Sequence, residues 1–255
     1  MSRAVAFAAA VLLWTSVLPD PIVAAEIKVL SPGAMMSSLK ALIPQFEQSS
    51  GHKVTVTYSP ALALADRIKD GEVADVVILG EGPADSLERL GRLVAGSRTV
   101  IARVGVGVFV RRGDPKPDIG TVDAFNRALI NAKAIAYSDP ALGGTASNYV
   151  NGLLESLDIT GSIKSKVKLA TKYRSLADSV ANGGVDFGLN QIAEIVADQR
   201  LELVGPLPGP LQKYTHYTAA VVAAGSNPNA AKDLIGFLVS PAASDVMKVR
   251  GFEPL

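Results

Sequence analysis

The sequence contains no cysteine and only two histidines, His52 and His216. The absence of cysteine excludes disulfide bonds, thiol nucleophiles and thiolate metal sites together. With two histidines, a histidine-rich metal site is excluded as well. We therefore expect neither a metal nor a cofactor. The chemistry that remains is binding by backbone amides, hydroxyls and charges, or acid–base catalysis.

Charge and aromatic residues are also scarce. The formal net charge of the 255 residues is +1, aromatic residues make up 5%, and no basic cluster extends beyond Arg111 and Arg112. Nucleic-acid binding needs a basic surface and often stacking aromatics, so we expect no nucleic-acid partner. The hydrophobic content of 48% is enough for a sizeable core. No coiled-coil or other assembly motif is present, so we expect a monomer.

The first 25 residues have the pattern of a Sec-type signal peptide. A short basic start with Arg3 is followed by an apolar run at 4–17 and by small residues at 23–25, ahead of Glu26. The alternative is an N-terminal membrane anchor, but the apolar run is short for a span of about 20 residues. We expect cleavage near Ala25 and a periplasmic protein.

The residues after this leader alternate between strand and helix patterns. Strands are expected at 27–30, 54–58 and 75–79, and helices at 36–48, 62–70 and 84–93. This order predicts an α/β fold with right-handed crossovers. The continuous apolar run of the third strand is typical of a mostly parallel sheet that helices cover on both faces.

A second α/β series follows a long apolar stretch at 99–110, and a last strand at 218–224 can return to the first series. We therefore expect two lobes, each a mostly parallel sheet flanked by helices, with the crossover near Arg103. Lobe I would comprise residues 26–103 and 218–255, and lobe II residues 104–217. Ligands in such sheets bind beyond the carboxyl ends of the strands, which here means a cleft between the lobes.

Four turns follow strands and are expected to open on this cleft. A helix that starts at such a turn offers free N–H groups and the positive end of its dipole to an anion. Ordinary βα turns and simple N-capping by Thr145 or Ser147 are the alternatives. Gly144, with its neighbour Gly143, allows a close backbone approach that capping alone does not need. The candidate residues in these turns are Ser31, Gly33, Ala34, Met35, Ser59, Pro60, Ala61, Ser138, Gly144, Thr145, Ala146, Ser147 and Gln191.

Several motifs together resemble the type II periplasmic solute-binding proteins, specifically the molybdate-binding-protein-like group. The resemblance covers essentially the whole chain after the leader and implies their two-lobed fold. The motifs are VLSPGA at 29–34, LADRIKDGEVADVVI at 64–78, AYSDP at 136–140, FGLNQIAEI at 187–195 and FLVSPAA at 237–243.

The resemblance also indicates which ligand is not expected. Molybdate binders of this group surround the oxyanion with two serine hydroxyls and a tyrosine hydroxyl, and these positions correspond to Ala34, Ala61 and Gln191. Each lost hydroxyl removes about 1 kcal/mol or more, so the affinity for molybdate would fall by orders of magnitude. The backbone amides that the group uses near Ala146 and Tyr173 would remain. A less compact small anion is therefore expected.

The same group includes an exported aconitate isomerase, which the chain also resembles in RGDPKPDI at 112–119 and in AYSD at 136–139. Moving a proton across an allylic tricarboxylate requires cationic clamps and a positioned acid or base. Clamps would come from Arg67, Lys172 and Arg174, and the acid or base from Asp139, Tyr173 or His216. Solvated surface charge and packing near a hinge are the alternatives for these residues.

Three functions remain open. The first is the solute-binding protein of an ABC-type importer, which closes around a small anion and meets a transporter permease. The second is an exported isomerase of a small polycarboxylate. The third is a sensory or scaffold module that uses the same fold without transport.

Overall fold

The computed structural model describes residues 24–171 and 175–253. The predicted leader lies almost entirely outside this range, but β1 starts at Glu26, directly after the predicted cleavage site. Within the described range, no helix combines the length and the apolar character needed to cross a membrane.

In the described part of the chain, nine strands form one sheet with the order β2-β1-β3-β9-β4-β7-β5-β6, and β8 pairs with β4. The strands are β1 (Glu26–Ser31), β2 (Lys53–Tyr58), β3 (Val76–Gly80), β4 (Thr99–Arg111), β5 (Ile135–Ser138), β6 (Val167–Ala170), β7 (Phe187–Gln191), β8 (Leu201–Pro206) and β9 (Tyr214–Val221). The α-helices are α1 (Met36–Ser50), α2 (Ala61–Lys69), α3 (Glu81–Arg89), α4 (Val122–Asn131), α5 (Thr145–Ser156), α6 (Thr160–Ile163), α7 (Ser175–Ala181), α8 (Ile192–Val196), α9 (Pro228–Leu238) and α10 (Pro241–Val249). Four short 3₁₀ turns are also present in the described part: η1 (Gly33–Met35), η2 (Pro140–Leu142), η3 (Lys164–Lys166) and η4 (Gly209–Leu211).

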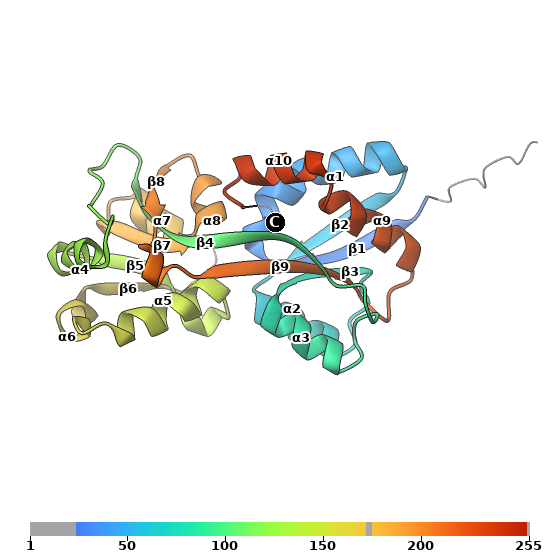
Figure 1. Ribbon diagram of the computed structural model, residues 1–255, viewed down its shortest axis with the longest axis horizontal. Helices are drawn as coiled ribbons and strands as arrows, with labels where there is room; N and C mark the ends of the chain where they lie inside the picture. Colours follow the sequence, from blue (N-terminus) through green and yellow to red (C-terminus); the bar gives the residue numbers. More distant parts are fainter. Residues whose placement is uncertain (1–23, 172–174, 254–255) are drawn as a thin grey trace, which may run out of the picture.

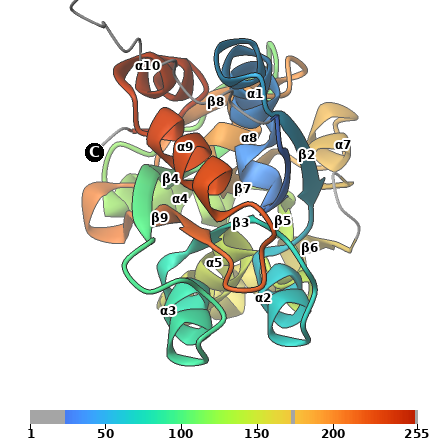
Figure 2. The same ribbon diagram turned by 90° about the vertical axis from the view of Figure 1, so that its right-hand side faces the viewer.

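The first half of the molecule is built on β1, β2 and β3, which run parallel. Helices α1, α9 and α10 cover one face of this sheet, and α2 and α3 cover the other (Figures 1 and 2). Every residue of β3 is buried, and its side chains alternate between two cores. Val76 and Ile78 pack with the first group of helices, whereas Val77 and Leu79 pack with the second. This double burial explains the uninterrupted apolar run in the sequence.

The second half has the same design. β5 pairs in parallel with β6 and β7, while β7 and β8 pair antiparallel with β4. On one face of this sheet Val108 packs with Phe125 of α4 and Val150 of α5. On the other face Phe109 packs with Leu176 of α7 and Ile195 of α8. Successive β4 residues therefore serve opposite cores, as the two-residue period of a strand requires.

Two long strands, β4 and β9, join the halves (Figure 1). β4 pairs with β9 from Thr99 to Gly105 and with β7 from Val106 onward. The change of partner falls inside the strand, two residues beyond Arg103, where we expected the crossover. The return strand also starts earlier than predicted, at Tyr214. The assignment of residue ranges to two lobes that move relative to one another remains a prediction.

Two elements that shape the site were not predicted. β8 carries Glu202, Gly205 and Pro206, which break the apolar alternation by which a strand is recognised. It also pairs with β4 through an irregular register. Helix α8 spans five residues, too few to show a helical period. Both elements are held by tertiary contacts, because α8 packs on β8, β4 and η1.

Candidate ligand-binding site

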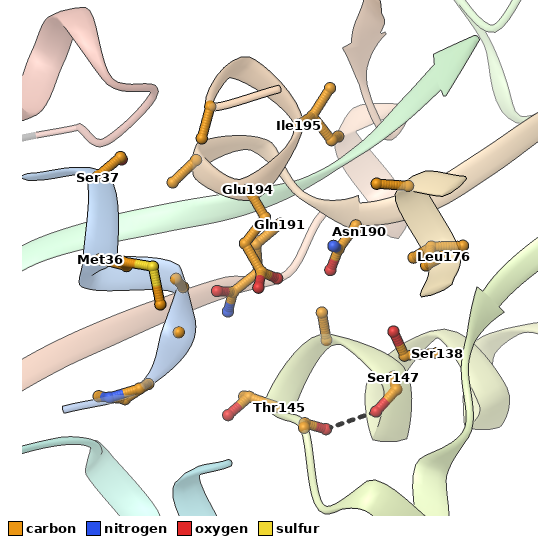
Figure 3. Close-up of a pocket in the computed structure, with 18 of the residues that line it drawn as sticks. Met36, Ser37, Ser138, Thr145, Ser147, Leu176, Asn190, Gln191, Glu194 and Ile195 are labelled. Carbon is orange, nitrogen blue, oxygen red and sulfur yellow. Dashed lines mark hydrogen bonds between the residues drawn. The ribbon is translucent and has the colours of Figure 1, made fainter. Parts of the chain in front are cut away.

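A cavity of about 400 Å³ lies where the two halves face one another. Its first wall comes from the first half and consists of residues between Pro32 and Lys40, in η1 and α1, together with the start of α2. Its second wall comes from the second half, with the turn before α5, the start of α7, and α8 (Figure 3). The cavity therefore sits beyond the carboxyl ends of β1, β2, β5 and β7, as expected for ligand sites in open α/β sheets.

The structure brings most of the predicted site residues to this cavity. The predicted residues that line it are Gly33, Ala34, Pro60, Ala61, Ser138, Gly144, Thr145, Ala146, Ser147 and Gln191.

The other predicted site residues do not line it or cannot be placed. Ser31 is fully buried, and its hydroxyl donates to the carbonyl of Pro32 at 3.3 Å. Met35 is fully buried in the core under α1. Ser59 is outside the lining, and its N–H donates to the carbonyl of Ser31. Tyr173 and Arg174, like Lys172, lie outside the described residues.

The start of α5 contributes backbone donors to the second wall. Its N-cap is Gly144, and no side chain is hydrogen-bonded at the cap. The Ser147 hydroxyl instead donates to the carbonyl of Gly144 at 2.9 Å (Figure 3). Thr145 and Ser147 therefore do not cap the helix. The first N–H groups of α5, at residues that line the cavity, are left for a ligand.

The walls approach one another closely at Gly143, just before this helix. Its φ of +73° favours glycine, and a Cβ there would lie 3.2 Å from Cβ of Leu62 on α2. A larger residue at this position would push the start of α2 away from the start of α5. Gly143 thus allows two helix N-termini from opposite halves to share one cavity.

The first wall offers few side-chain donors. Pro60 is the N-cap of α2 and has no capping side chain, and Ala61 follows it. η1 likewise begins after Pro32, without a side-chain cap, and continues with Gly33 and Ala34. Among the described lining residues, Lys40 is the one cation, and it is exposed. This wall is therefore made mainly of backbone and small apolar groups.

A buried hydrogen-bonded chain lies at the floor of the cavity. The Gln191 amide donates from Nε2 to Oγ1 of Thr215 at 3.2 Å, and its Oε1 accepts from the Tyr217 hydroxyl at 2.8 Å. Both Gln191 and Tyr217 are almost fully buried. Burial is the largest cause that raises the pKa of the Tyr217 phenol, and the nearby Glu194 adds to it. The phenol is therefore neutral, and Gln191 is fixed by partners from β9.

The least expected group in the cavity is the carboxyl of Glu194, on α8. Burial raises its pKa to about 7, although a hydrogen bond from the Asn190 side chain acts in the opposite direction. Figure 3 shows Glu194 and Gln191 pointing together into the cavity, with Thr145 on the opposite side. Near neutral pH this carboxyl is therefore divided between its protonated and its ionised form. The sequence analysis did not single it out. The available signal was one acid within an apolar turn, between Ala193 and Ile195.

The acid–base and clamp candidates chosen from the sequence lie elsewhere. Arg67 forms a bidentate ion pair with Glu72. His216 Nδ1 is 3.6 Å from Oε1 of Glu81, and Asp139 accepts a hydrogen bond from the N–H of Ala141. Arg67, Asp139 and His216 are not among the lining residues. In the described part of the chain, no group of three or more acidic or histidine side chains is arranged to hold a metal ion.

A family model described as bacterial extracellular solute-binding protein matches residues 27–253. The chain belongs to this family. Like other members, this solute-binding protein has the α/β periplasmic binding protein fold, which confirms the predicted fold class. The family is extracellular or periplasmic, in agreement with the expected export.

The chain is also similar to two curated relatives and to one solved structure. An aconitate isomerase from Pseudomonas sp. is 30% identical over 244 residues, covering 92% of each chain. The molybdate-binding protein ModA from Azotobacter vinelandii is 25% identical over 236 residues, covering 90% of each chain. The structure of an Azotobacter vinelandii periplasmic molybdate-binding protein has a TM-score of 0.72 and 20% identity, covering 89% of this chain and 98% of that one. The similarity to this solved structure shows a shared fold only.

Proposed function

We propose that this solute-binding protein binds a small organic carboxylate between its two lobes and delivers it to the permease of an ABC-type importer. The observation that carries the proposal is that two helix starts without side-chain caps, at Gly144 and Pro60, face one cavity whose first wall carries the alanines Ala34 and Ala61. Backbone N–H groups and helix dipoles attract an anion. Residues 26–103 with 218–255 and residues 104–217 would close around it by bending at β4 and β9.

The lining favours an organic acid over a tetrahedral oxyanion. By the resemblance to molybdate binders, Ala34, Ala61 and Gln191 would take the positions of their hydroxyl donors. The amide of Gln191 is engaged with Thr215 and Tyr217. A compact oxyanion has no apolar part to place against alanine methyls. A carboxylate attached to a short carbon skeleton places its oxygens at the helix starts and its carbons against Ala34 and Ala61.

A thermal-shift panel on the mature chain tests the proposal with molybdate, tungstate, sulfate, citrate, cis-aconitate and trans-aconitate. A carboxylate present at about 100 times its Kd adds roughly 2.7 kcal/mol to the free energy of unfolding, which a melting curve resolves. We expect at least one carboxylate to raise the melting temperature and the three inorganic anions to leave it unchanged. A shift with molybdate or sulfate alone would contradict the proposal.

A second function is favoured by two specific observations. The aconitate isomerase relative is 30% identical over nearly the full chain. The cavity also contains Glu194, whose pKa of about 7 allows it to give up or take a proton at neutral pH. An isomerase of the aconitate type needs such a group beside its substrate. Incubating the protein with trans-aconitate and following the cis isomer by NMR decides this, and an absence of turnover removes the alternative.

A further inference from the structure

Glu194 occupies an unusual position for an acid in a site that attracts anions. Its side chain extends from α8 into the cavity, opposite the start of α5 (Figure 3). A hydrogen bond connects it to Asn190, and Tyr217 lies close enough for the Glu194 charge to act on its pKa. An anion drawn to the helix N-termini therefore comes close to another carboxyl group.

Among residues 24–171 and 175–253, no charged group on the surrounding elements neutralises this carboxyl. Burial is the largest cause acting on its pKa, and the Asn190 hydrogen bond is the only opposing cause within the described residues. Lys40 on the first wall is exposed. The other charged groups near α8 have their own partners: Asp198 with Arg200, Glu202 with Lys116, Arg103 with Glu253, His216 with Glu81, and Arg250 with the carbonyl of Ser37.

Two ionised carboxylates do not share such a site without a large penalty, because like charges at hydrogen-bond distance repel in a partly dry cavity. One proton held between them removes the repulsion and creates a strong hydrogen bond, since a donor that faces an ionised acceptor bonds more tightly than a neutral pair. The neighbouring Asn190 side chain is hydrogen-bonded to the Glu194 carboxyl, and an amide can serve either protonation state because it both donates and accepts.

We propose that Glu194 is protonated when the site is occupied and that its O–H donates a hydrogen bond to a carboxylate of the ligand. Binding then takes up a proton from the solvent at pH values above neutrality. The inference rests on the proposed carboxylate site. It adds that the affinity for the carboxylate depends on the protonation state of Glu194. The affinity for the anion is therefore higher at and below neutral pH, where Glu194 can be protonated, and it falls as the pH rises above neutrality.

The test is calorimetric titration of the mature chain with trans-aconitate, cis-aconitate and citrate, in two buffers of different ionisation heat. The wild type is compared with Glu194→Gln, whose amide donates without a proton to exchange. We expect the wild type to take up close to one more proton per ligand than Glu194→Gln at pH 8.5. Its affinity should also fall about tenfold for each pH unit above 7.5, while that of Glu194→Gln stays level.

Comparing the two proteins with the same ligand removes any proton that the ligand itself takes up. Glu202→Gln is the matched control, because Glu202 lies on β8, outside the lining, and pairs with Lys116. It should behave as the wild type does. A circular-dichroism melt confirms that each variant is folded.

Two results would overturn the inference, and only the second would also overturn the proposed carboxylate site. If a probe binds and the proton uptake of the wild type equals that of Glu194→Gln, Glu194 is not the proton carrier, and the carboxylate site stands. If no probe binds either protein at pH 6, where Glu194 is mostly protonated, the carboxylate site itself is wrong, and this inference falls with it.

Discussion

The two walls of the cavity are built from the same motif, a strand followed by a helix start, yet they carry different chemistry. The first wall presents Ala34, Ala61, Ser37 and backbone, with Lys40 at its edge. The second wall presents hydroxyls at Ser138 and Thr145, and the carboxyl of Glu194. The shared motif offers backbone N–H groups to an anion on both sides, whereas the side chains differ. Among the described lining residues, only Glu194 of the second wall has a pKa raised to about 7.

The largest effect should come from placing a charge where the ligand's own charge is expected. Thr145→Asp adds a carboxylate at the start of α5, where the helix dipole favours it, so the protein should remain folded. The added charge would occupy the anion site and lower the affinity for a carboxylate ligand at least 100-fold, measured by calorimetry.

Asn229→Asp is the matched control for this change. It places the same charge in the first turn of α9, at an exposed position outside the lining. Its affinity should equal that of the wild type. An unchanged affinity in Thr145→Asp would show that the start of α5 does not hold the anion.

The second effect isolates Glu194 in the absence of ligand. Its pKa is about 7 in the folded protein and near 4.5 in the unfolded chain, so the folded state binds the extra proton between these values. Its contribution to stability is complete below about pH 4.5 and is lost as the pH rises through 7. Between pH 5 and pH 8 the wild type should lose about 2 kcal/mol of unfolding free energy relative to Glu194→Gln.

Urea unfolding at pH 5 and pH 8 measures this difference. Glu202→Gln serves as the control, because the hydrogen bond from Lys116 lowers the pKa of Glu202 and no proton is exchanged in this window. Equal pH dependence in the wild type and in Glu194→Gln would mean that the second wall carries no group that titrates near neutrality.

The contrast between the walls also shows how far sequence reasoning reached. The turns at Gly33, Pro60 and Gly144 follow from local patterns: apolar strands, glycine or proline breaks, and helical periods. The α/β order and the cavity beyond the strand ends follow from the same patterns. These features depend on residues close together in the chain, and they were predicted.

Ser138, Thr145 and Gln191 of the second wall were predicted, but the carboxyl of Glu194 and the hydrogen bond between Gln191 and Tyr217 depend on distant contacts and were not. Glu194 looks like the polar side of a short surface helix until β4, β8 and η1 pack around α8 and partly bury it. Gln191 and Tyr217 are 26 residues apart and meet because β7 and β9 both flank β4. A raised pKa is a property of the assembled surroundings, which no local pattern encodes.

A third change would make the first wall resemble that of an oxyanion binder. Ala34→Ser with Ala61→Ser restores two hydroxyls, each able to add about 1 kcal/mol to the binding of an anionic acceptor. Molybdate affinity should rise about tenfold or more, and carboxylate affinity should change less. Ala63→Ser, exposed on the same helix as Ala61, is the control and should change neither. A double variant that gains no molybdate affinity would refute the assigned position of these alanines.

The smallest effect concerns Lys40, the cation at the edge of the first wall. Because Lys40 is exposed, its attraction for an anion about 4 Å away is worth about 1 kcal/mol, and salt screens it. Lys40→Gln should weaken carboxylate binding about threefold to fivefold at low ionic strength and almost not at all in 1 M salt. Lys69→Gln, at the exposed end of α2, should have no effect at either ionic strength. If Lys40→Gln binds as tightly as the wild type at low salt, the first wall attracts the anion through its backbone alone.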